Sequence, residues 1–200
     1  MTQDLHIHTI FSDGDSAVVP QQTVELVAFA KHADIVGISD HSECFLADRY
    51  EEYYTAVKKA GLYCGVEVNG FKRAETVINY EFDYFIYHCN GSEPRDYAGF
   101  ELLLKTGKPS IIAHPYAVGT DLSRVPSGSL VEINNRYVWR YDWRKELGPY
   151  VDKFRWVFGS DAHQPNWLSQ SIARRVGEEL GVEETILFAK NMMREKALIN

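Results

Sequence analysis

Short apolar runs alternate with longer segments of helical periodicity along most of the chain. The runs are rich in Val, Ile, Tyr and Phe, as buried strands are, and they predict strands at residues 4–9, 35–39, 62–68, 84–89, 110–113, 130–133 and 155–159. Apolar residues at helical spacing predict helices at residues 20–32, 50–60, 97–106, 143–154, 169–180 and 183–197. Because strands that alternate with helices are typical of βαβ units, we expect a parallel sheet.

Seven strands within 200 residues fit two α/β architectures, an incomplete (β/α) barrel or a doubly wound sheet. Polar residues directly follow nearly every predicted strand, and in a barrel such positions meet at one mouth, which favours the barrel. The chain has no internal repeat, low-complexity tract or linker-like composition. We therefore expect one domain over residues 1–200.

The composition narrows the class of protein. Apolar residues make up 45% of the chain and charged residues 24%, as in globular proteins, and no apolar stretch is long enough to span a membrane. The 21 basic against 28 acidic residues leave a net charge of -7, which disfavours a general nucleic-acid-binding surface. The start MTQDLHIHT lacks the pattern of an export signal, and Cys44, Cys64 and Cys89 are too scattered for a disulfide framework. We expect a cytoplasmic protein with reduced thiols.

The histidines are concentrated at the ends of the predicted strands. Only His32 lies elsewhere, and the others are His6, His8, His41, His88, His114 and His163. Acidic residues share these positions, namely Asp13, Asp40, Glu67 and Asp161. Residues two apart on a strand point to the same side, so His6 with His8, and Asp161 with His163, can each present two ligands to one metal. A single histidine in such a position is usually an ordinary loop residue, but six of them at one mouth predict a metal centre.

Imidazole nitrogen and carboxylate oxygen, without thiolate, suit Zn, Mn or Fe. These candidate ligands exceed the coordination number of one ion, so the sequence predicts two or three divalent ions. Clustered ions activate water and neutralise the charge on phosphate oxygens, which makes a phosphate monoester or diester the natural substrate.

Six motifs occur in this order along the chain: DLHIHTIFSDGDS, GISDHSE, GVEVNG, YHCN, AHP and GSDAH. In these motifs, which span residues 4–163, the chain resembles the polymerase and histidinol phosphatase (PHP) family of metal-dependent phosphoesterases. The resemblance implies a distorted seven-stranded (β/α) barrel with two or three metal ions at its C-terminal mouth. By similarity, one ion is held by His6, His8, Glu67 and Asp161, a second by Glu67, His88 and His114, and a third by Asp13, His41 and His163.

Two further residues are candidates for roles in the reaction. Asp40 lies beside His41 but is out of phase with it, which predicts either a supporting carboxylate or a proton donor to the leaving group. Arg136 follows the strand at 130–133, and its planar guanidinium suits phosphate oxygens. Weaker candidates for a phosphate-binding cation are Arg49, Arg73 and Arg140.

We expect an enzyme that hydrolyses a small phosphate ester, either a phosphorylated metabolite or a nucleotide. An exonuclease that acts on nucleic-acid ends is the nearest alternative, but the acidic chain has no basic cluster at the mouth, so nucleic acid beyond short nucleotides is disfavoured. A non-catalytic, metal-stabilised interaction module is a further alternative, and the filled ligand positions argue against it. Amide hydrolysis in a similar barrel commonly uses a lysine carbamate, and no lysine follows a predicted strand.

Overall fold

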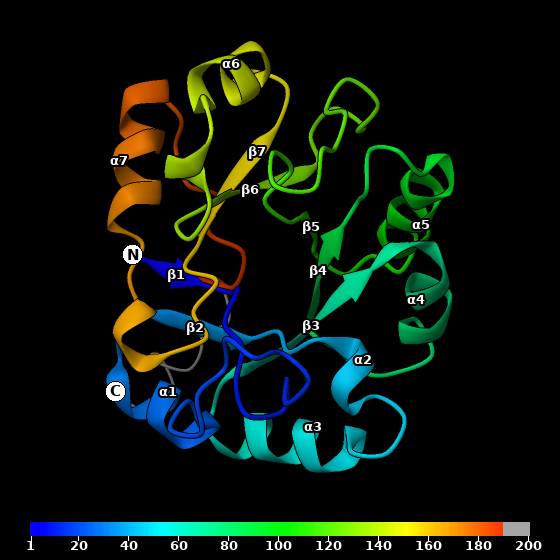
Figure 1. Ribbon diagram of the computed structural model, residues 1–200, viewed down its shortest axis with the longest axis vertical. Helices are drawn as coiled ribbons and strands as arrows, with labels where there is room; N and C mark the ends of the chain where they lie inside the picture. Colours follow the sequence, from blue (N-terminus) through cyan, green and yellow to red (C-terminus); the bar gives the residue numbers. More distant parts are fainter. Residues whose placement is uncertain (190–200) are drawn as a thin grey trace.

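The computed structural model describes residues 1–189 (Figure 1). Its sheet has seven strands, all parallel, and each strand pairs with the next one along the chain. The strands are β1 (Gln3–Asp4), β2 (Ile35–Ile38), β3 (Tyr63–Asn69), β4 (Tyr84–His88), β5 (Ser110–Ile112), β6 (Leu130–Asn134) and β7 (Arg155–Gly159).

Helices surround the strands on the outside (Figure 1). They are α1 (Val24–Ala30), α2 (Ser42–Phe45), α3 (Tyr50–Lys59), α4 (Gly70–Val77), α5 (Pro94–Leu104), α6 (Trp143–Leu147) and α7 (Ser171–Leu180), with short 3-10 turns at Val138–Arg140, Gly148–Tyr150 and Pro165–Trp167. Within residues 1–189, none of the helices is both long and apolar enough to cross a membrane.

The first and last strands meet just beyond their C-terminal ends. The Asp161 amide donates to the His6 carbonyl at 2.8 Å, and the His8 amide donates to the Ala162 carbonyl at 2.9 Å. These bonds nearly close the sheet, and the structure therefore confirms the distorted seven-stranded (β/α) barrel.

Alternate residues on each strand share a face, and the inward face changes from apolar to polar along the strand. On β6 the inward side chains run from Leu130 to Glu132 and Asn134, and on β7 they begin at Val157. Leu130 and Val157 belong to one buried apolar cluster that fills the barrel, with Leu5, Ile35, Tyr84, Ile86, Ile111 and Ala113. This cluster forms an apolar floor beneath the polar mouth.

Some predicted helices differ from those in the structure. The helix predicted at 143–154 ends at Leu147, because Gly148 and Pro149 open a 3-10 turn. Residues 183–188 are not helical, since the Thr185 amide donates to the Trp156 carbonyl at 2.7 Å and Glu184 bridges to Trp156. Residues 190–197 of that predicted helix lie outside the described residues. The short helices α2 and α4 were not predicted.

Tyr84 fills the barrel interior and requires glycine on the neighbouring strands. Its hydroxyl donates to the Leu5 carbonyl at 2.7 Å, and a Cβ added at Gly37 or Gly65 would overlap its ring.

Gly65→Ala should therefore destabilise the fold by about 1–3 kcal/mol, the usual cost of overpacking. Gly148→Ala is the matched control, because a Cβ there meets nothing within 4 Å and φ is -49°. Urea unfolding measures both variants, and equal stabilities would contradict this packing.

Candidate metal centre

All but one of the predicted metal ligands meet at the C-terminal end of the barrel. They are His6, His8, His41, Glu67, His88, His114, Asp161 and His163. The Glu67 carboxylate lies at their centre. Its Oε2 is 2.8 Å from His41 Nδ1 and 3.2 Å from His8 Nε2. Its Oε1 is 3.5 Å from His6 Nε2, 3.9 Å from His114 Nε2, and in contact with His88 Nε2.

Glu67 is almost completely buried, with 1% of its surface exposed. Burial alone would raise the pKa of Glu67, but the neighbouring imidazoles, first His88 and His41, outweigh it and hold the pKa well below its usual value. The carboxylate is therefore ionised. A buried anion is stable only with compensating partners, and the nearest here are His88 Nε2 and His41 Nδ1.

Asp161 supplies the second buried carboxylate. Its Oδ1 lies 3.6 Å from His8 Nε2 and 3.3 Å from His163 Nδ1, and its Oδ2 lies 3.9 Å from His114 Nε2. The backbone of Asp161 has a φ of 53°, in the left-handed region that few residues other than glycine adopt. Such strain is typical of functional sites. This turn directly follows the residues that close the barrel.

Hydrogen bonds fix the tautomers of His6 and His8. His6 Nδ1 lies 2.8 Å from Glu132 Oε1, and this carboxylate oxygen accepts the Nδ1–H. His8 Nδ1 lies 3.3 Å from Ser12 Oγ, whose own proton is donated to Asp40 Oδ1 at 2.6 Å, so Ser12 accepts from His8. In its neutral form, each ring therefore directs an Nε2 lone pair inward. Both Nε2 atoms are buried and have no hydrogen-bond partner among residues 1–189.

Glu132 was missed by the sequence analysis. Besides holding His6, its Oε2 accepts the His114 amide at 2.9 Å and the Asn134 side-chain amide at 3.0 Å. A Cβ at Gly159 would overlap the Glu132 carboxylate, so the glycine of the GSDAH motif makes room for it. The available signal was a glutamate in the apolar run LVEIN, in phase with the residues that face the barrel interior.

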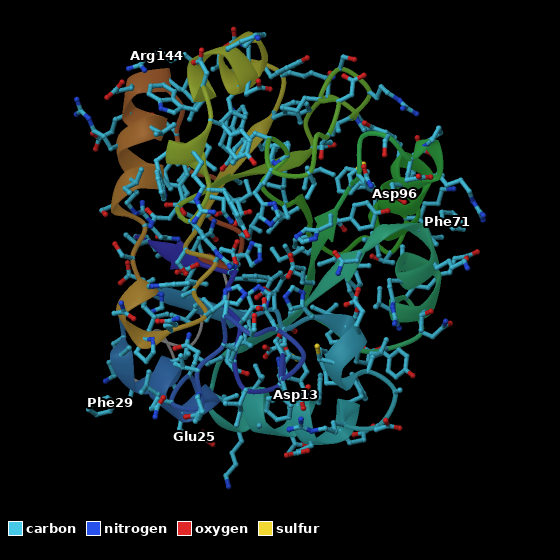
Figure 2. All side chains as sticks on the ribbon, viewed as in Figure 1. Asp13, Glu25, Phe29, Phe71, Asp96 and Arg144 are labelled. Atoms are coloured by element: carbon cyan, nitrogen blue, oxygen red, sulfur yellow. The ribbon has the colours of Figure 1, made fainter. Side chains whose placement is uncertain are left out.

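The structure does not bring Asp13, a predicted metal ligand, to the other candidate ligands, and Asp15 lies beside His41 and His163 instead. Asp13 is 61% exposed, and its carboxylate pairs with Arg49 Nη1 at 3.1 Å on the loop between β1 and α1 (Figure 2). Asp15 Oδ2 instead lies 2.9 Å from His163 Nε2 and 3.4 Å from His41 Nε2. The tight turn at 12–15 turns Asp13 outward and Asp15 inward. Arg49, a weaker candidate for binding phosphate, forms ion pairs with Asp13 and Glu52.

Asp40 supports the site but does not face the mouth. Its carboxylate accepts the Thr9 amide at 2.6 Å, the Thr9 hydroxyl at 2.6 Å and the Ser12 hydroxyl. Burial raises the pKa of Asp40 to about 6, although the hydrogen bonds from Ser12 and Thr9 lower it. Of the two roles that the sequence left open, the contacts of Asp40 favour the supporting carboxylate, because its side chain is fully buried and its oxygens hold Thr9 and Ser12 of the loop after β1.

Arg136 lies at the mouth, as the sequence predicted. Its Nη1 is 3.4 Å from Asp161 Oδ1 and 3.2 Å from the His163 ring nitrogens. The guanidinium carbon lies 5.1 Å from the Tyr137 ring centre and 5.3 Å from that of Trp167. Two aromatic rings thus hold the guanidinium beside a candidate metal ligand.

The donors at this site fit divalent metals. Among residues 1–189, three groups have ligand atoms within 4.8 Å of one another: His8, His41 and His163; His6, His8 and Asp161; His6, Glu67 and His114. Burial and the nearby His88 lower the pKa of His114 to about 4, and burial also lowers the pKa of His8. Both rings are therefore neutral at neutral pH, the form in which imidazole binds a metal.

A parallel (β/α) barrel whose mouth gathers imidazoles around two buried carboxylates defines a barrel with a candidate centre for divalent metal ions. The model of the PHP domain matches residues 4–136, more than half of the chain, and the protein belongs to the PHP domain family, which is typically one of metal-dependent hydrolases. No curated protein matches the chain. The family match ends at Arg136, and β7 and the residues after it contribute Asp161 and His163 to the same site.

The different positions of Asp13 and Asp15 allow a test with two matched variants. Asp15→Asn should weaken the metal site at His41 and His163 by about 10- to 100-fold in affinity, the usual effect of disturbing a ligand environment. Asp13→Asn removes the same charge from an exposed position and should leave metal binding unchanged. Elemental analysis of both variants, purified without chelator, measures the ions per chain. A loss of metal in the Asp13 variant alone would contradict the assignment.

Proposed function

We propose that the protein is a metal-dependent phosphoesterase that hydrolyses a small phosphate ester, a phosphorylated metabolite or a nucleotide, with an activated water molecule. The proposal rests on the buried Glu67 carboxylate and the five imidazoles around it. Arg136 adds a cation at the same mouth. The family match supports metal-dependent hydrolysis, and the chemistry of the site supports phosphate as the group attacked.

The contacts support three adjoining ion sites. We assign the first to His6, His8, Glu67 and Asp161, the second to Glu67, His88 and His114, and the third to Asp15, His41 and His163. When bound there, Zn, Mn or Fe would supply Lewis acidity toward phosphate oxygens and lower the pKa of water. Glu67 would contribute a ligand to two of these sites.

The residues around the ligands orient the site before substrate binds. Glu132 and Ser12 hold the rings of His6 and His8, and Asn134 Nδ2 donates to Asp161 Oδ2 at 3.2 Å. Only Nη1 of the Arg136 side chain has a hydrogen-bond partner within the described part of the chain. Its remaining guanidinium protons are available to phosphate oxygens. Such preorganisation lowers the cost of reaching the transition state.

The surroundings of the mouth favour a small substrate over a polynucleotide. A cavity of about 720 Å³ beside His41 is lined by Asp13, Asp15 and Glu43 together with Asn69 and Cys44. A long strand that crossed this side would bring phosphates against carboxylates, and the net charge is -7. Bound cations offset repulsion for the reacting phosphate only, so the exonuclease alternative is disfavoured. The assembled ligands likewise disfavour a non-catalytic module.

Three predictions from the sequence accompany this proposal. A single domain over residues 1–200 and a cytoplasmic location stay predictions. The preferred metal is expected among Zn, Mn and Fe from the nitrogen and oxygen donors.

The proposed role of Arg136 predicts a kinetic effect without loss of metal. Arg136→Lys keeps a positive charge but loses the planar fork, so kcat/KM for a phosphate ester should fall by about tenfold. Metal content, measured on the same preparation, should stay constant. Unchanged kinetics in this variant would show that another group grips the phosphate.

The proposed substrate class is tested by comparing turnover of small phosphate esters and single-stranded oligonucleotides at matched phosphate concentration. Protein purified without chelator is assayed with Mn, Zn and Fe at two salt concentrations. We expect faster turnover of the small esters and only a weak dependence on salt, because the carboxylates on the His41 side of the mouth would repel flanking phosphates. Faster, strongly salt-sensitive cleavage of the oligonucleotides would overturn the proposal in favour of the exonuclease.

A further inference from the structure

Arginines alternate with aromatic residues in the segment that follows β6, RYVWRYDWR at 136–144. Each of its three arginines lies over at least one ring. The Arg140 guanidinium carbon lies 5.1 Å from the Tyr137 ring centre and 5.0 Å from that of Trp139. The guanidinium carbon of Arg144 lies 3.8 Å from the Trp143 ring centre. Arginines stacked on rings are held in a defined plane, with their N–H edges directed outward.

The three arginines differ in their acidic partners. Arg136 pairs with Asp161, and Arg144 pairs with Glu179. Arg140 has no carboxylate within ion-pair distance among residues 1–189, and its side chain is exposed. Arginine does not lose its proton in proteins, so Arg140 presents a permanent positive charge that the rings hold in place but do not neutralise.

Arg140 is also close to the metal centre. The Tyr137 ring centre lies 4.9 Å from that of His114, and the same tyrosine ring contacts the guanidinium groups of both Arg136 and Arg140. One aromatic ring therefore separates Arg140 from a candidate metal ligand. A molecule of metabolite size whose phosphate lies at the metal centre spans that separation.

We propose that Arg140 binds a second anionic group of the substrate, a phosphate or a carboxylate, on the same small molecule as the phosphate that is hydrolysed. Arg136 grips the reacting phosphate, and Arg140 selects substrates by their distal charge. A planar guanidinium binds either anion through two parallel hydrogen bonds. The acidic cavity on the His41 side leaves the 136–140 side as the cationic flank of the mouth. This inference rests on the proposed phosphoesterase function and specifies its substrate class.

The test uses three non-hydrolysable probes with the same five-carbon chain: pentylphosphonate, pentane-1,5-bisphosphonate and 6-phosphonohexanoate. Their dissociation constants are measured by calorimetry on the metal-loaded protein. The wild type should bind at least one of the two probes that carry two anionic groups about tenfold more tightly than pentylphosphonate. A charge-assisted hydrogen-bonded pair with Arg140 would account for this gain in affinity. Whichever of these two probes binds more tightly shows whether the distal group is a phosphate or a carboxylate.

Arg140→Gln should abolish that preference without changing the affinity for pentylphosphonate. Arg144→Gln is the matched control and should keep the preference. This arginine, labelled in Figure 2, is also stacked on a tryptophan but is paired with Glu179. Equal wild-type affinity for all three probes, or a preference that persists in Arg140→Gln, would overturn the inference. Hydrolysis of pentyl phosphate by the wild type tests the phosphoesterase function separately, since that substrate carries only one anion.

Discussion

The placement of one buried carboxylate, that of Glu67, constrains the rest of the mouth. Its two oxygens are approached by imidazoles from five different points of the chain, and almost none of its surface is exposed. An ionised carboxylate in such surroundings is stable only if positive charge compensates it. Clustered divalent cations would provide that compensation, and the same cations would supply the chemistry that the proposed hydrolysis of a phosphate ester requires.

The fold keeps Glu67 and its partners in place through two layers of support. Beneath the site, the apolar cluster around Tyr84 fills the barrel and excludes water from the strand interior. Around the site, buried polar residues such as Asp40 and Glu132 use their hydrogen bonds to hold the loop after β1 and the ring of His6. Side chains held in this way lose little conformational entropy when a ligand binds. These hydrogen bonds hold side chains where metals are expected, and the segment that carries Arg136 and Arg140 adjoins the site through Tyr137.

Much of this arrangement could be predicted from sequence because strand ends in a parallel barrel converge whatever the details of the loops. Six of the seven predicted strands are confirmed in position. The first, predicted at 4–9, shares only Asp4 with the observed strand Gln3–Asp4, and the backbone at His6 and His8 bonds to Asp161 and Ala162 instead. The histidines converge for the same reason. The predicted ligand that differs from the structure lies in a loop, where hydrophobic periodicity gives no information. Asp13 and Asp15 share one turn, and only its folded path decides which of the two points inward.

Glu132 and Asp40 show a second limit of sequence reasoning. Glu132 lies in a strand whose sequence is otherwise mostly apolar. Its role is evident only from its contacts with Gly159 on the neighbouring strand and with His6. Asp40 lies next to a predicted ligand, so adjacency suggested a part in the chemistry. The structure turns its carboxylate toward Thr9 and Ser12 instead. Both cases depend on contacts between residues distant in the chain, which local patterns do not encode.

The central claim is that Glu67 holds metal ions that the hydrolysis of a phosphate ester requires. The most direct measurement is the metal content and phosphate-ester turnover of Glu67→Gln, purified without chelator, beside Glu184→Gln as a control, because Glu184 pairs with Arg174 away from the mouth. We predict that Glu67→Gln loses at least one ion per chain and about a hundredfold or more in turnover, while the control keeps both. Full metal content and full turnover in Glu67→Gln, or full turnover by metal-free wild-type protein, would contradict the account.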